Sequence, residues 1–471
     1  MKLTNFDMVI FGATGDLAMR KLLPNLYQAH AAGLLHKQGR ILAVSRSQLS
    51  RDEFLARVEQ EAKIHLPENI SAQVWQTFLQ RLDYLSVNVL QFNDFQTLQG
   101  KISAKNSDAV VIYLSTAPHY FATACKHLAQ VGLNHDKVRI VLEKPLGTDL
   151  DSSRAINTAV AQFFQEKQIY RIDHYLGKES LQNLLPLRFA NPLLAQVWHK
   201  DWVKSVELTV AEELGVEERG EFYDQTGALR DMVQNHMLQM LCLVAMETPK
   251  SLTADDVRDE KLRVLQALKV LPENEVAQNV VRAQYQGYTT EHRVASDSQT
   301  ETFVALRAHL NTPRWQDVPF YLRTGKRLNQ RYASIILNLK PQQTLFGEQS
   351  SRLVIQIQPK ERIEWQIAVK QAGNHLTVTP AWGSLDLKQN TQTRRADAYE
   401  LLLLEIIEGR LNLFNRADEL EAAWRWVMPI LNAWKSQNIP LYTYVSGSTG
   451  PIEAEQLLAQ DGAKWHELTA L

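Results

Sequence analysis

The sequence predicts a doubly wound parallel α/β sheet at the N-terminus, followed by a large α+β domain with a mainly antiparallel sheet. Two observations carry this prediction. In residues 1–175, short and almost wholly apolar runs alternate with helical segments, which is typical of parallel strands covered by helices on both faces. In residues 176–471, strands alternate apolar and polar side chains, as in residues 206–210, which indicates an antiparallel sheet with one buried face.

Apolar runs and helical periodicity place the elements in order along the chain. In residues 1–175, strands are expected at 7–11, 41–45, 85–92, 109–114, 139–142 and 169–171. The helices of this domain are expected at 21–32, 51–62, 95–102, 120–131 and 151–164. In the second domain, strands are expected at 206–210, 280–285, 303–310, 335–339, 353–357 and 365–369. Helices at 229–246, 396–408 and 419–434 are expected to pack on one face of that second sheet.

Composition narrows the class of protein. Hydrophobic residues make up 45% and charged residues 22% of the 471 positions, which is ordinary for a folded globular chain. With 51 basic and 52 acidic residues the net charge is -1, so the chain lacks the positive field of a nucleic-acid-binding protein. No apolar run reaches the ~20 residues that span a membrane. The apolar run at residues 8–11 is too short for a signal peptide, so a cytoplasmic location is expected. Cys125 and Cys242 are too few and too far apart for a disulfide framework or a zinc site, so no metal is expected.

A glycine-rich turn follows the first predicted strand and opens the first helix: Gly12, Ala13, Thr14, Gly15, Asp16 and Leu17. Small residues here let the backbone approach a pyrophosphate, which then accepts from free amides at the positive end of the helix dipole. The spacing is Gly-x-x-Gly-x-x-Ala rather than the usual three-glycine pattern, so a plain strand-to-helix turn is the alternative interpretation.

Two cations follow other strands of the same sheet. The second strand ends in Ser45-Arg46-Ser47, where an NAD-binding protein commonly has an acid. A guanidinium between two hydroxyls suits the 2'-phosphate of NADP, although a solvated surface arginine is the alternative. Lys144 follows the fifth strand in a Glu-Lys-Pro turn, at the edge where ligands of such sheets bind, although this turn could also be structural.

The segment Arg171-Ile172-Asp173-His174-Tyr175-Leu176-Gly177-Lys178-Glu179 resembles the substrate signature of the glucose-6-phosphate dehydrogenase family. Further segments similar to the family occur in the same order at 12–26, 143–147, 231–236 and 323–328, so the resemblance covers nearly the whole chain. It implies an NADP-binding Rossmann-like domain at 1–175 and a substrate-binding and oligomerisation domain at 176–471. The implied reaction oxidises C1 of glucose 6-phosphate to 6-phosphogluconolactone, the first step of the oxidative pentose phosphate pathway.

The resemblance also implies residue roles. His236 would be the general base and Asp173 would orient it; a histidine suits this role because its ordinary pKa, about 6.5, lies near working pH. Without the family, a lone histidine on this helix would more often be a satisfied core residue. The substrate phosphate is expected at His174, Tyr175 and Lys178. The remaining expected substrate ligands are Lys144, which would lie between cofactor and sugar, the sugar-hydroxyl acceptors Glu212 and Asp231, and the cations Lys326 and Arg331.

Departures from the family pattern are small: two touch no proposed chemistry, and the third, Arg331, keeps the positive charge but can alter the geometry offered to the phosphate. Leu146 stands where the family often has Phe, Thr14 where it often has Ser, and Arg331 where Lys also occurs. Another sugar or polyol oxidoreductase would not need the Asp173-His174-Tyr175 segment. A catalytically silent NADP-binding sensor would be favoured by loss of His236 or Asp173, and both residues are present. The large second sheet predicts self-association into a homodimer or homotetramer.

Overall fold

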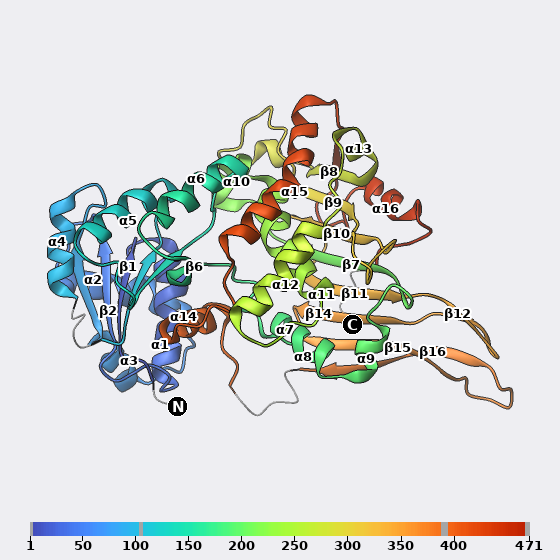
Figure 1. Cartoon of the computed structure of the whole chain (residues 1–471), viewed down its shortest axis with the longest axis horizontal. Coiled ribbons are helices and arrows are strands. Elements are labelled where there is room, and N and C mark those ends of the chain that lie inside the picture. The colour runs from blue at the N-terminus through green and yellow to red at the C-terminus, as the bar shows by residue number, and fades with distance from the viewer. Residues whose placement is uncertain (1–2, 103–106, 388–393, 467–471) are drawn as a thin grey trace. The chain divides into compact units, whose positions relative to one another are not determined.

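A computed structural model describes residues 3–102, 107–387 and 394–466 of the chain (Figure 1). The chain divides into two compact units. Unit 1 comprises Met1–Gly177, Ser251–Arg258 and Arg395–Glu421. Unit 2 comprises Lys178–Lys250, Asp259–Arg394 and Ala422–Leu471.

Unit 1 is built on a six-stranded, wholly parallel sheet with the order β3-β2-β1-β4-β5-β6. The order reverses between β1 and β4, which is the switch point where such sheets bind ligands at their carboxyl edge. The predicted parallel sheet is therefore confirmed. The strands are β1 (Phe6–Phe11), β2 (Arg40–Ser45), β3 (Leu82–Ser86), β4 (Ala109–Leu114), β5 (Val138–Leu142) and β6 (Ile169–Arg171).

Helices cover both faces of this sheet, which explains why its strands are continuously apolar. Along β1, Met8 and Ile10 belong to one buried cluster, whereas Val9 and Phe11 belong to a second. Both sets are fully buried because successive side chains of a strand point to opposite faces. The main helical elements of unit 1 are the π-helical turn η1 (Ala18–Leu22), α1 (Leu23–Ala31), α2 (Arg51–Glu61), α3 (Ala72–Leu79), α4 (Phe92–Lys101), α5 (Phe121–Gln130), α6 (Leu150–Ala161) and α14 (Ala398–Glu408).

The expected strand at 85–92 is misplaced, because β3 runs from Leu82 to Ser86 and α4 begins at Phe92. Asn88 sits in the intervening turn. Its side-chain Oδ1 accepts from the Leu90 amide at 3.1 Å and its carbonyl accepts from the Gln91 amide at 2.9 Å. Such a local asparagine turn competes with strand pairing, so the apolar residues beyond it do not extend the strand.

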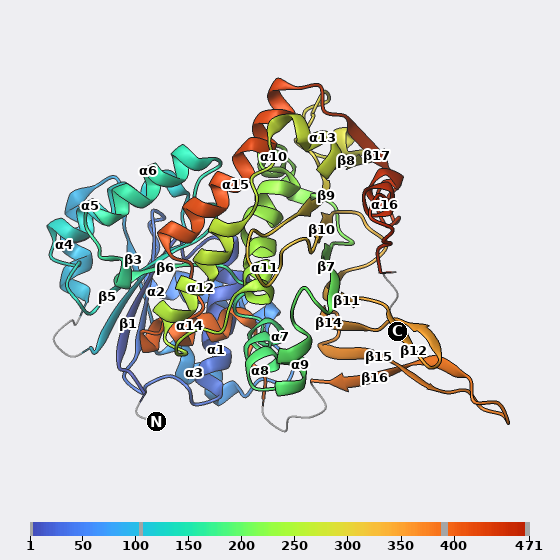
Figure 2. The same cartoon turned by 45° about the vertical axis from the view of Figure 1, so that its right-hand side comes forward.

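The helix expected at 396–408 is α14, and its predicted place on the second sheet is wrong. Its residues Leu402, Leu403 and Ile406 are buried in the same cluster as Met8 of β1. Figures 1 and 2 both show α14 beside α1. Arg139 of β5 fixes its C-terminal turn by donating to the Ile406 carbonyl at 2.7 Å. This helix therefore completes the core of unit 1.

Unit 2 contains a nine-stranded mixed sheet with the order β16-β15-β14-β11-β7-β10-β9-β8-β17. Its pairs are antiparallel except for β7 with β10 and β8 with β17, which confirms a mainly antiparallel sheet. The strands are β7 (Val203–Ala211), β8 (Val280–Tyr285), β9 (Phe303–Ala308), β10 (Phe320–Gly325), β11 (Tyr332–Leu339), β14 (Arg352–Gln358), β15 (Arg362–Lys370), β16 (Val378–Asp386) and β17 (Leu441–Tyr444), with a small separate hairpin of β12 (Gln342–Thr344) and β13 (Gly347–Gln349).

The prediction of one solvated face fails for the central strand β7, where Glu207 and Thr209 are as buried as their apolar neighbours. Glu207 is satisfied inside the fold, because its carboxylate accepts from the Asn338 side chain at 2.7 Å and from the His466 amide at 2.9 Å. At Glu207, the polar position of the alternating pattern is therefore buried and hydrogen-bonded inside the fold rather than exposed to solvent.

The helices of this part of the chain are α7 (Glu179–Gln182), α8 (Leu184–Phe189), α9 (Pro192–Val197), α10 (Gly220–Asp224), the π-helix η6 (Leu229–Met237), α11 (Leu238–Ala245), α13 (Val276–Asn279) and α16 (Ile452–Ala459). Two further helices, α12 (Ala254–Ala267) and α15 (Ala417–Ser436), carry residues of both units.

Within the described parts of the chain, no helix combines the length and the apolar character needed to cross a bilayer.

Candidate active site

The glycine-rich turn lies at the carboxyl end of β1, beside the switch point of the sheet. Gly12 has a φ of +76°, and a Cβ at this position would collide with the Ser115 carbonyl at the end of β4. The Gly15 amide donates to the Gly12 carbonyl at 2.9 Å, and helical backbone begins at Asp16. Only glycine fits the first position, and the turn presents the start of a helix at the edge where a pyrophosphate would lie. This cradle fits a dinucleotide.

Arg46, Lys144 and Asp173 share this edge, because each follows a strand of the same parallel sheet. Arg46 is exposed directly after β2. Of the two serines that flank it, Ser45 is buried and hydrogen-bonded to the Tyr84 hydroxyl at 2.7 Å. Arg46 is therefore the side chain of this turn best placed to meet an anion.

The substrate signature begins where β6 ends, and its first turn is held by Asp173. This carboxylate is 1% exposed, and its Oδ1 accepts from the Tyr175 amide at 2.9 Å. The Asp173 carbonyl accepts from the Leu176 amide at 3.1 Å. Tyr175 is buried, whereas His174 is half-buried and its ring stacks on Tyr399 with the centroids 6.1 Å apart. Asp173 thus has a structural task besides any catalytic one.

In unit 2, Glu212, Lys326 and Arg331 gather at one end of three neighbouring strands. Glu212 follows β7 and Lys326 follows the parallel β10, whose last residues pair in register. Arg331 precedes β11, whose first residue pairs with the last residue of β7. The Lys326 Nζ lies 2.7 Å from a Glu212 carboxylate oxygen, so the two predicted ligands form an ion pair. Arg331 is exposed.

Tyr223 lies beside Lys326 and was not anticipated from the sequence. Its buried ring has the Lys326 Nζ 4.9 Å from its centroid. Burial raises the pKa of Tyr223 well above its usual range, and the nearby carboxylates of Asp231, Glu301 and Glu212 raise it further. The phenol therefore stays protonated beside two of the predicted sugar-hydroxyl ligands.

Asp231 and His236 both lie on η6, where the predicted helix has π geometry. Residues five apart are stacked along a π-helix, because its hydrogen bonds join positions i and i+5. Asp231 and His236 are five positions apart and so project from the same side. His236 is 1% exposed. A single π-helical stretch inside a longer helix is a frequent mark of a functional site.

Lys178 stands at the N-terminal cap of α7, which packs against β14. Its Nζ donates to the side-chain oxygen of Gln358 at 3.3 Å. Gln358 ends β14 and is a second residue that sequence reasoning missed, since a glutamine at a strand end carries no distinctive signal.

The predicted site residues thus form two sets. Asp173 lies in unit 1 and His236 in unit 2, so their pairing stays a prediction, as do the individual roles. Unit 1 brings residues Gly12 to Leu17, Arg46, Lys144, Asp173, His174 and Tyr175 to one sheet edge. Unit 2 carries Lys178, Glu212, Asp231, His236, Lys326 and Arg331.

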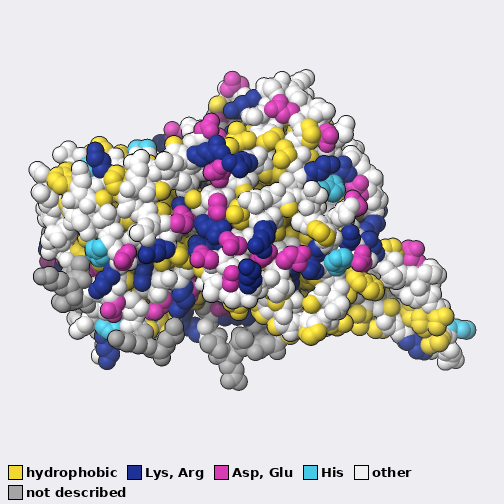
Figure 3. All heavy atoms as spheres, viewed as in Figure 1, with side chains coloured by type: hydrophobic (Ala, Val, Ile, Leu, Met, Phe, Trp, Pro, Cys, Tyr) yellow, Lys and Arg dark blue, Asp and Glu magenta, His cyan; other side chains and the backbone are white. Residues whose placement is uncertain are grey.

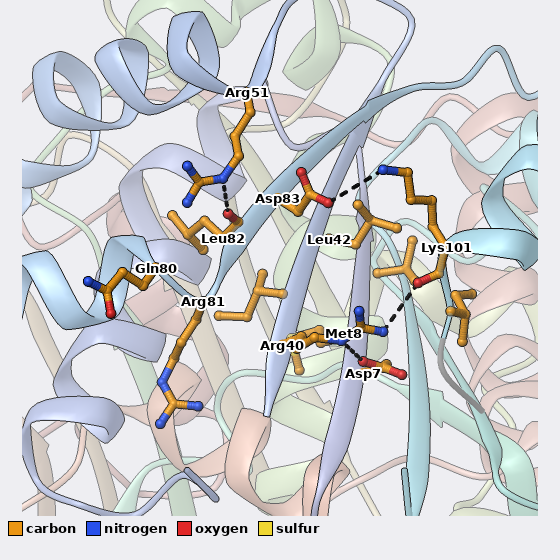
Figure 4. A pocket seen from close by; sticks show the side chains of 13 residues that line it. Asp7, Met8, Arg40, Leu42, Arg51, Gln80, Arg81, Leu82, Asp83 and Lys101 are labelled. Carbon is orange, nitrogen blue, oxygen red and sulfur yellow. Dashed lines mark hydrogen bonds and ion pairs between the residues drawn. The ribbon is translucent and has the colours of Figure 1, made fainter. Parts of the chain in front are cut away.

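A pocket of about 360 Å³ lies at the opposite, amino edge of the unit 1 sheet (Figure 4). Arg40 lies 2.7 Å from Asp7 there, and Lys101 lies 3.9 Å from Asp83. Arg51 donates to the Leu82 carbonyl at 2.9 Å. None of the predicted site residues lines this pocket, and its charged groups are engaged with one another and with the backbone.

Comparison with known proteins agrees with this arrangement. Residues 9–183 match the model of the glucose-6-phosphate dehydrogenase NAD binding domain, and residues 185–466 match that of the glucose-6-phosphate dehydrogenase C-terminal domain. The chain belongs to the glucose-6-phosphate dehydrogenase family. Its fold is that of this family, and it is a nicotinamide-cofactor dehydrogenase.

Individual relatives match over their full length. The glucose-6-phosphate 1-dehydrogenase of Gluconobacter oxydans is 44% identical, over 98% of both chains. The crystal structure of the enzyme from Mycobacterium avium superimposes with a TM-score of 0.88 at 33% identity, covering 98% of this chain and 99% of the other. A glucose-6-phosphate dehydrogenase solved in complex with its substrate glucose-6-phosphate has a TM-score of 0.91 at 31% identity, covering 99% and 100%.

Proposed function

We propose that the protein oxidises glucose 6-phosphate at C1 to 6-phosphogluconolactone, with NADP as the hydride acceptor. Family membership supports the reaction class. The observation that carries the substrate is the position of the Asp173-His174-Tyr175 segment, directly after β6 and on the cofactor edge of the sheet. Another sugar or polyol oxidoreductase would not need this segment.

The choice of NADP is supported by Arg46. The carboxyl end of β2 faces the ribose in sheets of this kind, where an acid binds the 2'-hydroxyl of NAD and an arginine accommodates the 2'-phosphate of NADP. Here that end offers an exposed guanidinium and no carboxylate. A charge-assisted bond from Arg46 to the phosphate would favour NADP.

His236 acts as the general base, taking the proton of the C1 hydroxyl. The bound nicotinamide supplies the hydride acceptor. Asp173 orients the imidazole and stabilises the positive charge that the proton brings, which is the usual task of a carboxylate behind a catalytic histidine. Lys144, on the same sheet edge as Arg46, would lie between cofactor and sugar.

The remaining residues hold the sugar. His174, Tyr175 and Lys178 bind the phosphate, assisted by Arg331, because these side chains offer donors and positive charge to a dianion. Glu212 and Asp231 accept from sugar hydroxyls. The ion pair between Lys326 and Glu212 supports a joint role for these two at the hydroxyl-bearing part of the substrate.

The direct test is the near-ultraviolet absorbance of reduced nicotinamide after the protein is mixed with NADP and glucose 6-phosphate. A steady rise is expected, with a much slower rise on unphosphorylated glucose. The His236→Asn variant should lose about two to four orders of magnitude in turnover, the usual effect of removing a general base. A protein that binds NADP without any absorbance change would instead be a silent sensor.

We also propose that the chain forms a homodimer through an apolar strip on β15 and β16. Trp365, Ile367 and Val369 are 40%, 47% and 37% exposed and point to one face of β15, since they are two positions apart. Leu385 of the edge strand β16 joins this face, because it pairs in register with Ile363. Figure 3 shows hydrophobic side chains gathered over these strands. A symmetric second copy would bury such a strip.

The homodimer is tested by the molar mass in solution, from light scattering after size-exclusion chromatography. The wild type should give twice the mass of one chain. Changing Ile367 to Lys on the strip should yield monomers, whereas the control Leu252→Lys, which changes another exposed leucine, should not. A monomeric wild type would overturn the proposal.

A cytoplasmic site of action is proposed from the thiols: Cys125 and Cys242 are both buried and unbridged, which suits a reducing compartment. Cell fractionation tests this, and recovery of the protein outside the cytoplasm would contradict it.

A further inference from the structure

The start of α14 lies directly against the substrate signature, although about 220 positions separate the two in the sequence. A Cβ on Gly177 would lie 2.6 Å from the Ala398 carbonyl, so the signature backbone touches the first residue of the helix. Asp397 caps this helix by accepting from the Tyr399 amide at 2.9 Å. The cap therefore fixes the position of Tyr399 in the first turn of the helix.

From this fixed start, the Tyr399 ring covers His174. The two ring planes are 10° apart and the centroids are 6.1 Å apart, within the range of offset-stacked aromatic pairs. Tyr175 packs against the same imidazole from its neighbouring position, at 5.1 Å and 58°. His174 is thus held by one aromatic ring from its own segment and one from α14.

The other end of Tyr399 is anchored on a buried carboxylate. Its hydroxyl is hydrogen-bonded to the side chain of Glu143, the residue before Lys144. Glu143 is buried at the end of β5, and it also accepts from the Tyr113 hydroxyl of β4 at 2.5 Å. Burial, followed by the charges of Glu143 and Asp173, raises the pKa of Tyr399, so this phenol remains a hydrogen-bond donor.

We propose that Tyr399 is a positioning residue for the phosphate end of the substrate: it holds the His174 ring, and Glu143 with Tyr113 holds Tyr399. The inference rests on the proposed function of His174 as a phosphate ligand. An imidazole that is already ordered loses less side-chain entropy when it binds, so the benefit should appear as affinity for the phosphorylated sugar. Unphosphorylated glucose should gain nothing from it.

The test compares Tyr399→Leu with Tyr399→Phe. The leucine variant loses both the ring and the hydroxyl. Its KM for glucose 6-phosphate should rise about two- to tenfold, which corresponds to the free energy that one aromatic pair contributes. The phenylalanine variant keeps the ring but loses the hydrogen bond to Glu143, so it should recover only part of that loss. The KM for glucose and the dissociation constant of NADP should stay unchanged in both variants.

A double-mutant cycle decides whether Tyr399 acts through His174. In a His174→Asn background, Tyr399→Leu should change the KM for glucose 6-phosphate by less than twofold, because the ring that it positions is gone. Tyr27→Leu is the control: Tyr27 is a buried tyrosine of the core cluster against which Tyr399 packs, and its ring contacts Trp75. Its loss should lower stability without changing the KM.

The outcomes separate the two proposals. An equal loss on glucose, or an undiminished Tyr399 effect in the His174→Asn background, would overturn the positioning role. If His174→Asn by itself left the KM for glucose 6-phosphate unchanged, the assignment of His174 to the phosphate would fail instead.

Discussion

Asp173 illustrates how one side chain serves the fold and the chemistry together. Its Oδ1 accepts from the Tyr175 amide and shapes the signature turn, while its negative charge is proposed to support His236. The two tasks need different parts of the group, because the turn needs an acceptor oxygen and the base needs a charge. Substitutions can therefore separate them.

Asp173→Asn keeps a carbonyl Oδ1 and removes the charge, so it should fold normally and lose turnover. Asp173→Ala leaves the buried Tyr175 amide without its acceptor and should also lose about 1–3 kcal/mol of unfolding free energy. Turnover from nicotinamide absorbance and stability from urea unfolding measure the two effects. Equal stability losses in both variants would show that the charge, and not the acceptor, holds the turn.

Arg46 is proposed to carry a preference for NADP, because its exposed guanidinium follows β2, whereas the neighbouring Ser45 hydroxyl is hydrogen-bonded to Tyr84 inside the fold. Arg46→Ala should raise the KM for NADP much more than the KM for NAD, since only NADP presents the 2'-phosphate. Steady-state kinetics with both cofactors measures the ratio. Equal changes in the KM for NADP and the KM for NAD would show that Arg46 does not bind the 2'-phosphate.

At the scale of elements, the sequence predicts what local patterns encode. The strands 109–114 and 169–171 are found as expected, because buried parallel strands are continuously apolar and end at clear turns. The end of β3 depended on the Asn88 turn, and the place of α14 depended on long-range packing with α1. An apolar helix face predicts that the helix is buried, but not against which sheet.

In the candidate site too, local sequence patterns could be predicted and long-range packing could not. Residues in contiguous motifs, such as Gly12 and Asp173, could be found because the chain itself assembles them. Tyr223, Gln358 and Tyr399 could not, since each comes near the motif residues only through packing between distant segments. The π geometry of η6 was also missed, because its sequence is compatible with the 3.6-residue period of an ordinary helix.

Lys178 joins two elements, α7 and β14, through its hydrogen bond to Gln358. Lys178→Ala should weaken glucose 6-phosphate strongly and leave the slow reaction with glucose nearly unchanged, because the charge is needed only for the phosphate. Kinetics on both sugars provides the test. Gln358→Leu removes the hydrogen-bond acceptor but not the charge, and should have the smaller effect. A proportional loss on glucose would mean that Lys178 supports the fold.

For the molecule as a whole, basic and acidic residues are balanced in number. The net charge is -1, and basic and acidic side chains are interspersed on the face seen in Figure 3. Such a surface offers no broad positive field, so recognition of an anionic substrate rests on local groups. Stability in acid depends on groups whose pKa differs between the folded and the unfolded state.

His466 is one such group, and it predicts how the stability of the molecule depends on pH. Burial, followed by the charges of Arg352 and Arg323, lowers the pKa of His466 to about 4. Its Nδ1 accepts from the Arg352 guanidinium at 3.1 Å, which requires a neutral ring nitrogen there. Because the folded state disfavours protonation, the contribution of His466 is complete above its unfolded pKa of about 6.5. It is lost as the pH falls from there toward about 4.

His466→Gln can keep a hydrogen-bond acceptor for Arg352 but does not titrate. The free energy of unfolding should therefore fall less between pH 7.5 and pH 4.5 in this variant than in the wild type, although both lose stability as other groups titrate. Urea unfolding at the two pH values gives the comparison. A matched control is His375→Gln, which changes an exposed histidine on the same unit and should follow the wild type. If His466→Gln also followed the wild type, the protonation of His466 would not be a source of acid sensitivity, and the Arg352 contact would tolerate a charged ring.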